Sequence, residues 1–285
     1  MQERTEGLHL GGEDGVAPVH VARGTPLVVI AGPCVLEGIE LAHEIAGGLA
    51  AACRAASLPL VFKASFDKAN RTSVDSYRGP GLTEGLEMMR EIRSTHGIPV
   101  TTDVHSPEQA AEVARSVDLL QVPAFLCRQT DLLEACGATG RPVNVKKGQF
   151  QAPWDMAPAV EKVRAAGASA VMLTERGASF GYNNLVADMR SLPAMRDIGV
   201  PVCFDATHSV QLPGAKGRAS GGQRHMAPVL ARAAVAAGVE AIFLEVHPRP
   251  EESPSDAATV QGLRDVGALL QTLAEIHQVM IRSSS

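Results

Sequence analysis

The feature that most restricts the fold is a short apolar segment followed by a segment of helical composition, a unit that recurs eight times along the chain. Unbroken apolar runs of this length are typical of strands buried on both faces in a parallel sheet. We predict strands at Pro26–Cys34, Pro59–Phe66, Pro99–His105, Leu119–Phe125, Pro142–Gly148, Ala170–Gly177, Pro201–His208 and Ala241–His247. Helices are predicted at Ile39–Ser57, Leu82–Thr95, from Pro107 onward with Ser106 as the cap, and at Gln129–Ala138, Met156–Ala166, Leu185–Asp197, His225–Ala237 and Thr259–Ile281.

This alternation predicts one closed parallel (β/α)₈ barrel, a TIM barrel, as a single domain over residues 25–285. A doubly wound open sheet would share the alternation, but the chain has neither a GxGxxG nor a GxxxxGK[ST] motif. Nearly every predicted strand also ends in polar residues, which a barrel gathers at one mouth, where barrel active sites lie. Residues 1–24 are polar and glycine-rich and are predicted to form an N-terminal tail or hairpin.

Charge and hydropathy limit the classes of partner that the protein can bind. The formal net charge of −5 gives no overall attraction to nucleic acid or to an anionic membrane. The chain has no apolar run of about 18 residues and does not begin like a signal peptide, so we expect a cytoplasmic protein. Its cysteines show no CxxC pair and are five in number, Cys34, Cys53, Cys127, Cys136 and Cys203, so no disulfide framework is expected.

Cationic residues gather at or just after the predicted strand ends. Lys63, Lys68 and Arg71 lie within Val61–Ser73, and Lys146 and Arg176 follow later strands. Each could alone be a salt-bridge partner at the barrel rim, and Val61–Ser73 alone could be a solvated basic loop. Five cations at one mouth of a net negative protein instead predict a binding site for substrates with several negative charges, because unpaired desolvated cations are costly.

A second set of strand-end residues suits a divalent metal ion. Cys34, His208, Glu245 and Asp256 offer a thiolate, an imidazole and two carboxylates, which favour Zn²⁺, Fe²⁺ or Mn²⁺ over Mg²⁺. The first, seventh and eighth strands are neighbours once the barrel closes, so the residues on them can meet. By spacing alone the signal is weak, and a buried thiol with ordinary rim hydrogen bonds is the alternative.

Several strings resemble those of the 3-deoxy-D-manno-octulosonate 8-phosphate synthases, from about Val28 to Leu273. They include AGPC, FKASFDKANRTS, TDVHSPEQ, QVPAFLCRQTDLL, VNVKKGQF, FDATHSVQLPG and EVHPRPEESPSDAA. The resemblance implies a transferase that condenses phosphoenolpyruvate with D-arabinose 5-phosphate and releases phosphate, in the synthesis of the lipopolysaccharide sugar. It also implies a homotetramer.

The resemblance also implies roles for individual residues. Phosphoenolpyruvate would be bound by Lys63, Lys68, Lys146 and Arg176, with Lys146 and Arg176 on its phosphate. Asn70, Arg71 and Thr72 would bind the sugar phosphate, Arg71 and its neighbour across a subunit boundary. Gln121, at the end of a predicted strand, is a further substrate-binding candidate. Asp103, His105 and Asp205 are candidates for proton handling near the aldehyde. Because the metal-dependent branch has cysteine after the first strand, Cys34 places the chain there, with His208, Glu245 and Asp256 as the other ligands.

Two other functions stay open at this point. The sister 3-deoxy-D-arabino-heptulosonate 7-phosphate synthases share the barrel and the metal set, but their sugar loop reads KPRTS where this chain has KANRTS. A metal-dependent barrel hydrolase would release phosphate without a sugar acceptor. The loop Leu212–Gly222, with Lys216 and Arg218, is expected to be either a lid over the phosphates or a flexible surface loop.

Overall fold

The computed structural model describes residues 7–70, 76–214 and 221–283. Eight parallel strands form a closed ring in which each strand pairs with its neighbour in chain order and the last pairs with the first. They are β3 (Val28–Gly32), β4 (Leu60–Lys63), β5 (Val100–Asp103), β6 (Leu119–Val122), β7 (Val143–Lys146), β8 (Val171–Glu175), β11 (Val202–Asp205) and β14 (Ala241–His247). The predicted (β/α)₈ barrel is confirmed.

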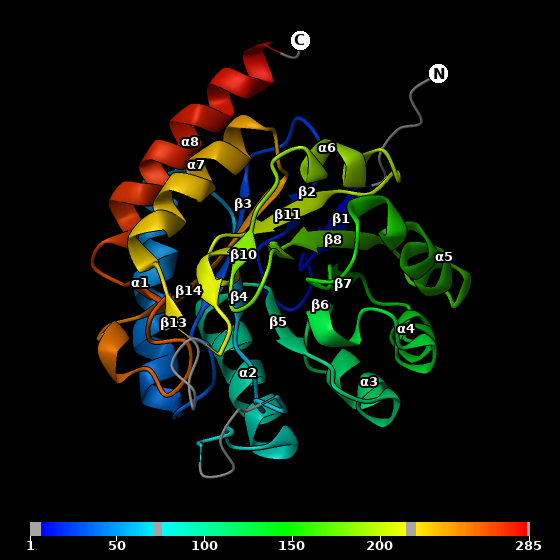
Figure 1. The fold of residues 1–285 in the computed structure, drawn as a ribbon. Helices are drawn as coiled ribbons and strands as arrows, with labels where there is room; N and C mark the ends of the chain where they lie inside the picture. The colour runs from blue at the N-terminus through cyan, green and yellow to red at the C-terminus, as the bar shows by residue number, and fades with distance from the viewer. Residues whose placement is uncertain (1–6, 71–75, 215–220, 284–285) are drawn as a thin grey trace.

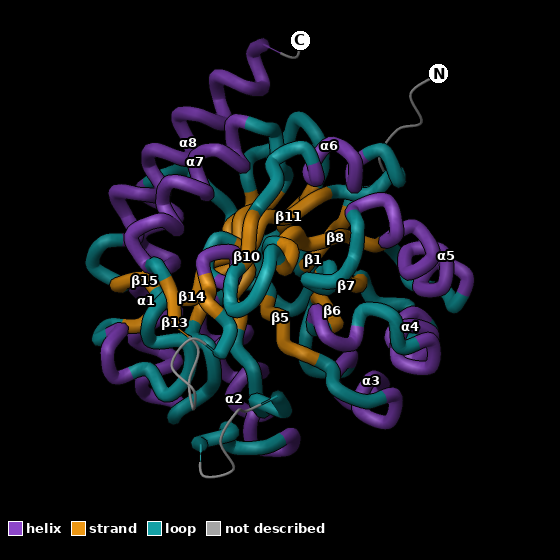
Figure 2. The backbone as a smooth tube through the Cα atoms, viewed as in Figure 1, coloured by secondary structure: helices purple, strands orange, loops and turns teal. Residues whose placement is uncertain are grey.

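The helices surround this ring (Figures 1 and 2). The largest apolar cluster combines side chains of the barrel strands and of the helices. They are α1 (Ile39–Ala55), α2 (Leu82–His96), α3 (Pro107–Ala114), α4 (Thr130–Gly137), α5 (Ala157–Ala165), α6 (Ser191–Arg196), α7 (Ala227–Ala236) and α8 (Val266–Ser283). Short 3₁₀ helices occur at η1 (Ala124–Leu126), η2 (Pro153–Met156), η3 (His208–Val210), η4 (Arg224–Met226) and η5 (Pro250–Glu252). No helix among the described residues is both long and apolar enough to cross a membrane.

Most predicted elements are slightly longer than the observed ones, and for three of them the structure gives the reason. The helix predicted from Leu185 begins only at Ser191, because Leu185–Val186 forms β10, which pairs with β9 (Ala178–Ser179), and Pro193 would interrupt a longer helix. The last helix begins at Val266, because β15 (Gln261–Gly262) first pairs with the end of β14. The strand predicted through Phe125 ends at Val122, since Pro123 cannot donate a ladder hydrogen bond.

The predicted start of α3 is confirmed. Ser106 occupies the N-cap position and Pro107 opens the helix, but the Ser106 side chain makes no capping hydrogen bond. The Gln109 carboxamide oxygen instead accepts a hydrogen bond from the His105 N–H at 2.9 Å. The turn after β5 is therefore held by Gln109, which fixes the backbone of His105.

An N-terminal hairpin closes one end of the barrel. Its strands, β1 (Leu8–Leu10) and β2 (Val19–Val21), are antiparallel, with alternate residues buried. The buried side chains join an apolar cluster with residues at or near the beginnings of the barrel strands, including Val28, Val61 and Ala241. The hairpin thus covers the N-terminal end of the barrel, and the carboxyl ends of the strands form the open mouth.

Candidate active site

A cavity of about 270 Å³ opens at the carboxyl ends of the strands. Its lining contains most of the predicted site residues, namely Lys63, Lys68, Asn70, Asp103, His105, Gln121, Lys146, Arg176, His208 and Glu245. Four of the predicted cations therefore line the same cavity as two of the predicted metal ligands, His208 and Glu245. Arg71, Thr72, Lys216 and Arg218 lie outside the described residues.

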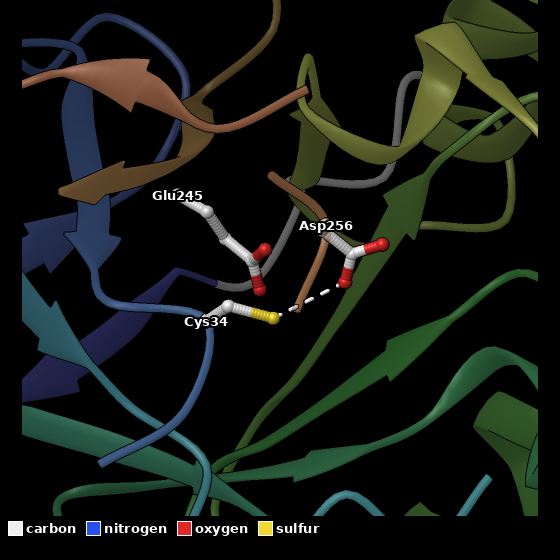
Figure 3. Close-up of side chains that lie close together, drawn as sticks. All are labelled: Cys34, Glu245 and Asp256. Atoms are coloured by element: carbon white, nitrogen blue, oxygen red, sulfur yellow. Dashed lines mark hydrogen bonds between the residues drawn. The ribbon is translucent and has the colours of Figure 1, made fainter. Parts of the chain in front are cut away.

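The predicted metal ligands converge beside this cavity. Donor atoms of Cys34, Glu245 and Asp256 all lie within 4.8 Å of one another, and the Cys34 thiol lies 3.1 Å from an Asp256 carboxylate oxygen (Figure 3). His208 Nε2 lies 3.6 Å from Glu245 Oε1 and 3.9 Å from Asp256 Oδ2. All four side chains expected to bind a metal thus face one another across the junction of β3, β11 and β14.

The backbone explains why Cys34 reaches this position. Gly32 ends β3 so close to β4 that a Cβ atom there would overlap the carbonyl oxygen of Lys63. With the two strands this close, Lys63 Nζ donates a hydrogen bond to the Cys34 carbonyl oxygen at 3.1 Å and contacts Glu245 Oε1 at 2.7 Å. One buried ammonium group therefore links the loop of Cys34 to the strand that carries Glu245.

Asp256 is held by a tight turn in the loop after β14. Its φ of 55° is in the left-handed region, and its carbonyl oxygen accepts hydrogen bonds from the N–H groups of Thr259 and Val260 at 2.8 and 3.1 Å. The Ser255 hydroxyl lies 3.0 Å from Asp256 Oδ2. These contacts aim the carboxylate back over the barrel mouth.

The charges of this cluster suit a divalent cation. Burial would raise the pKa of the Glu245 carboxyl, but Lys63, His208 and Lys68 together hold it well below its ordinary range, so it is ionised. Its second oxygen, Oε2, is buried and has no hydrogen-bond partner within the described parts of the chain. Burial and the adjacent Glu245 raise the pKa of the Cys34 thiol well above its ordinary value. An added positive charge would satisfy the free oxygen and stabilise the thiolate, so the four residues fit a metal ion.

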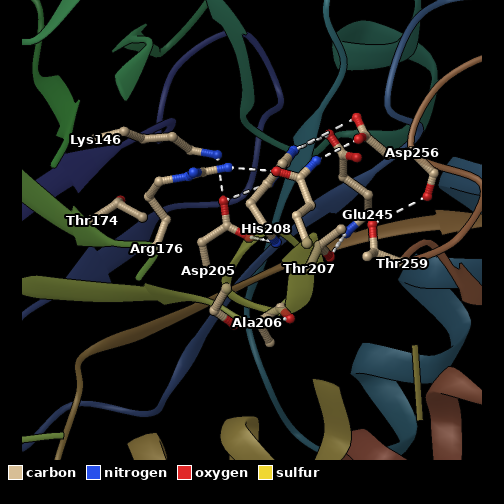
Figure 4. A network of polar contacts seen from close by, with 12 residues as sticks. Lys146, Thr174, Arg176, Asp205, Ala206, Thr207, His208, Glu245, Asp256 and Thr259 are labelled. Carbon is tan, nitrogen blue, oxygen red and sulfur yellow. Dashed lines mark hydrogen bonds and ion pairs between the residues drawn. The ribbon is translucent and has the colours of Figure 1, made fainter. Parts of the chain in front are cut away.

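Asp205 orients two members of the site at once (Figure 4). Its Oδ2 atom lies 2.7 Å from His208 Nδ1 and 2.6 Å from Lys146 Nζ. With Nδ1 engaged, His208 turns Nε2 toward Glu245 and Asp256, the arrangement common for metal-binding histidines. Although burial opposes it, the neighbouring His208 and Lys146 lower the pKa of the Asp205 carboxyl, which is therefore a fixed negative charge.

The cations on the other side of the cavity form a site for an anion. Lys146 Nζ lies 3.6 Å from the centre of the Phe243 ring, so one side of this ammonium group is apolar. Arg176 donates from Nη2 to Gln211 Oε1 at 2.7 Å, whereas its buried Nη1 has no hydrogen-bond partner among the residues described. Burial lowers the pKa of the Arg176 guanidinium, although the group stays protonated at neutral pH. A phosphate group would supply the missing acceptor.

Asp103 and His105 differ in what they can do with protons. The Asp103 carboxylate accepts hydrogen bonds from the Ser65 hydroxyl and from Gln121 Nε2, the latter at 2.7 Å. Burial would raise the pKa of Asp103, but Lys63 and Lys68 lower it, so it remains an ionised acceptor. Burial lowers the pKa of His105, and its Nδ1 has no partner in the described part of the chain. A neutral His105 is thus the better proton carrier of the two.

Two glutamines of the site are absent from the sequence-based prediction. Gln149 lines the cavity, and Gln211 joins Arg176 to Asp256. Each follows a predicted site residue by three positions, Lys146 and His208 respectively. Their nearness in sequence to those two residues was the only signal, because a neutral amide carries no charge pattern that sequence reasoning could detect.

Comparison with known proteins identifies relatives over nearly the whole chain. A sequence profile of the DAHP synthetase I family matches residues 11–281. A 2-dehydro-3-deoxyphosphooctonate aldolase of Nitratidesulfovibrio vulgaris is 58% identical over 258 residues, which cover 90% of this chain and 94% of the relative. Enzymes with the same name are 56% identical in Pelobacter propionicus, over 93% of this chain and 97% of the relative, and 56% identical in Alkalilimnicola ehrlichii, over 90% and 92%.

Proposed function

The chain belongs to the DAHP synthetase I family, and its alignment with 2-dehydro-3-deoxyphosphooctonate aldolases covers nearly the whole length of those relatives. We therefore propose that it condenses phosphoenolpyruvate with D-arabinose 5-phosphate and water. The products are 3-deoxy-D-manno-octulosonate 8-phosphate, the precursor of the lipopolysaccharide sugar, and inorganic phosphate. One observation carries the proposal beyond the comparisons. A single cavity places an anion site of buried cations directly beside a thiol, an imidazole and two carboxylates.

In this proposal the cations bind and orient phosphoenolpyruvate. Lys146 and Arg176 hold its phosphate, because Arg176 Nη1 has no acceptor among the described residues and Lys146 lines the same cavity. Lys63 and Lys68, on the other side of the cavity, hold its carboxylate, with Gln121 as a neutral neighbour. Because both ends of phosphoenolpyruvate are fixed, its C3 atom can be held in a near-attack geometry relative to the sugar aldehyde.

The sugar phosphate is assigned to the loop after β4. Asn70 lines the cavity, and Arg71 and Thr72, which follow it in the sequence, are assigned to the phosphate of D-arabinose 5-phosphate by family resemblance. The sequence KANRTS in this loop, in place of KPRTS, favours the five-carbon sugar over erythrose 4-phosphate, as the names of the relatives also do.

The proposed condensation proceeds through the following bond changes. The enol C3 of phosphoenolpyruvate attacks the sugar C1 aldehyde, whose oxygen takes a proton and becomes a hydroxyl. Water adds to the cationic C2 and loses a proton, giving a tetrahedral phosphohemiketal. The C2–O bond to phosphate then breaks, and the phosphate oxygen takes the bonding electrons, while the C2 hydroxyl loses its proton and becomes the ketone carbonyl of the product. Lys146 and Arg176 stabilise the charge that grows on that phosphate, and a neutral His105 accepts or returns a proton near the aldehyde.

Cys34, His208, Glu245 and Asp256 would hold a divalent metal ion such as Zn²⁺, Fe²⁺ or Mn²⁺. Bound there, the ion would supply a fixed positive charge beside the cavity, able to orient a polar substrate group. Asp205 keeps the His208 ring turned toward this position, and Lys63 keeps Glu245 ionised. We favour orientation as its role, because the metal-independent branch of the resembling family runs the same reaction.

We also propose a cytoplasmic homotetramer. Association of subunits is supported by aromatic side chains exposed on the segments after β6 and β7, where Phe125, Phe150 and Trp154 are 57, 59 and 66% exposed. Aromatic side chains are enriched where subunits meet. A cytoplasmic location fits substrates that are phosphorylated metabolites. Sedimentation of the purified protein tests the subunit number.

The proposed reaction is tested by phosphate release from phosphoenolpyruvate, with arabinose 5-phosphate or erythrose 4-phosphate as acceptor. We expect turnover with the five-carbon sugar only, loss of turnover after chelation, and recovery with Mn²⁺ or Zn²⁺. Turnover with erythrose 4-phosphate would identify the sister reaction instead. Steady phosphate release without any sugar would identify a hydrolase.

A further inference from the structure

Gln211 lies between the anion site and the metal cluster and touches both. Its Oε1 atom accepts a hydrogen bond from Arg176 Nη2 at 2.7 Å, and its Nε2 atom donates to Asp256 Oδ1. The orientation of this amide is fixed by its partners, because a guanidinium can only donate and an ionised carboxylate can only accept.

A neutral amide is the side chain that this position requires. A carboxylate at position 211 would accept from Arg176 but would repel Asp256, and an ammonium would donate to Asp256 but would repel Arg176. An apolar side chain would leave a second Arg176 nitrogen without a partner, in addition to the buried Nη1. Only an amide of this length satisfies both charged neighbours at once.

The backbone around Gln211 ties it to the loop that carries Asp256. Gln211 begins β12 (Gln211–Leu212), which pairs with β13 (Gly221–Gly222) in the register Gln211 opposite Gly222. A Cβ atom on Gly222 would overlap the Thr259 side chain, so this hairpin packs directly on the turn that follows Asp256. The Arg224 guanidinium also donates to the Ala257 carbonyl oxygen. A movement of Gln211 together with Arg176 would therefore also disturb the loop that carries Asp256.

We propose that Gln211 is a positioning residue that couples the metal cluster to the phosphate-binding site, so that a divalent cation and phosphoenolpyruvate each tighten the binding of the other. This inference rests on the proposed function. A cation that fixes the Asp256 carboxylate also fixes the Gln211 amide, which holds Arg176 ready for the phosphate. Coupling of this kind must be equal in both directions.

The test compares Gln211→Met, which nearly keeps the shape but removes both hydrogen bonds, with the wild type. Zn²⁺ affinity is measured on metal-depleted protein by competition with a chromophoric chelator, and phosphoenolpyruvate affinity by calorimetry with and without Zn²⁺. We expect metal affinity to fall about 10- to 100-fold, as for other residues that orient ligands. We expect the metal-induced gain in phosphoenolpyruvate affinity, about 5- to 150-fold for typical coupling, to fall toward unity.

Gln223→Met is the matched control, because Gln223 is exposed and lies directly after β13. It should leave both affinities within about twofold of wild type. Gln211→Asn keeps the amide but shortens the side chain, so it should give an intermediate loss and serves if Gln211→Met does not fold. Equal metal affinity and equal coupling in wild type and Gln211→Met, or wild-type protein whose phosphoenolpyruvate affinity ignores Zn²⁺, would overturn the inference. Failure of the proposed function is distinct, since it is measured by turnover with each sugar acceptor, whereas the coupling is measured by binding of Zn²⁺ and phosphoenolpyruvate without any sugar.

Discussion

Replacing Asp205 with asparagine is expected to destabilise the protein and to impair the reaction, because one carboxylate serves two charged neighbours. The carboxylate is fully buried and accepts from Lys146 Nζ at 2.6 Å, from His208 Nδ1 at 2.7 Å and from the His208 N–H at 2.9 Å. Asparagine keeps the shape but removes the charge that balances Lys146. Removing one partner of a buried ion pair costs about 3–5 kcal/mol. The amide oxygen can still accept one hydrogen bond, so we expect the free energy of unfolding to fall by about 2–4 kcal/mol.

The same substitution predicts a pH dependence with a definite sign. The folded pKa of Asp205 is depressed, although burial opposes this, by His208 and Lys146. Its stabilising contribution is therefore complete above the unfolded value of about 3.9 and is lost as the pH falls toward the lower folded value. Urea unfolding of metal-depleted wild-type and Asp205→Asn protein should differ by a constant amount from pH 7 to about pH 5, and by less below about pH 4.

The matched control is Asp188→Asn, which breaks an exposed ion pair with Arg190 at 2.8 Å. It should change the urea midpoint little, because exposed ion pairs contribute little to stability. Turnover of Asp205→Asn should fall at least about tenfold, since both Lys146 and the His208 ring lose their orientation. A midpoint equal to that of Asp188→Asn, or a stability difference that does not shrink in acid, would refute this reasoning.

Three further predictions concern other parts of the site and the frame that holds it. Cys34→Ala should lower the metal content of purified protein, measured by elemental analysis, and weaken Zn²⁺ binding by at least about tenfold, whereas full activity of metal-free Cys34→Asn would support an orienting role for the metal. Arg176→Lys should raise the KM for phosphoenolpyruvate by roughly tenfold or more, because an ammonium cannot keep the Gln211 contact and also bind phosphate through a second nitrogen; an unchanged KM would remove Arg176 from the phosphate site. Glu240→Gln should lower the free energy of unfolding by about 1–3 kcal/mol with kcat unchanged, because the buried Glu240 carboxylate binds Arg196 at 3.0 Å and the Val202 N–H at 2.8 Å, far from the cavity; a comparable loss of kcat would contradict a purely structural role.

The barrel strands could be predicted from the sequence because their apolar runs reflect burial on both faces. The same reasoning could not predict β9, β10 and β15, since strands of two residues carry no periodic signal. The helix expected from Leu185 was wrong because its composition was helical while Pro193 and the β9–β10 pairing decided the local structure.

The site was predictable to the extent that closure of the barrel determines it. Cys34 and Glu245 meet because β14 pairs with β3, and His208 joins them because β11 pairs with β14. Which group contacts which could not be predicted, since it depends on loop geometry. The sequence offered Asp103, His105 and Asp205 as equal candidates for proton handling, whereas their burial and neighbouring charges leave Asp103 and Asp205 ionised and His105 neutral.

The N-terminal hairpin has a consequence for how the chain is made. Leu8 and Val21 belong to the same apolar cluster as Ala241 and Phe243, so segments from opposite ends of the chain complete one another. The ribosome synthesises the hairpin long before the strand of Ala241. The apolar face of the hairpin therefore stays incompletely covered until that strand has been made. Contacts this distant in sequence are slow to form, and the waiting surface is open to aggregation and to chaperones.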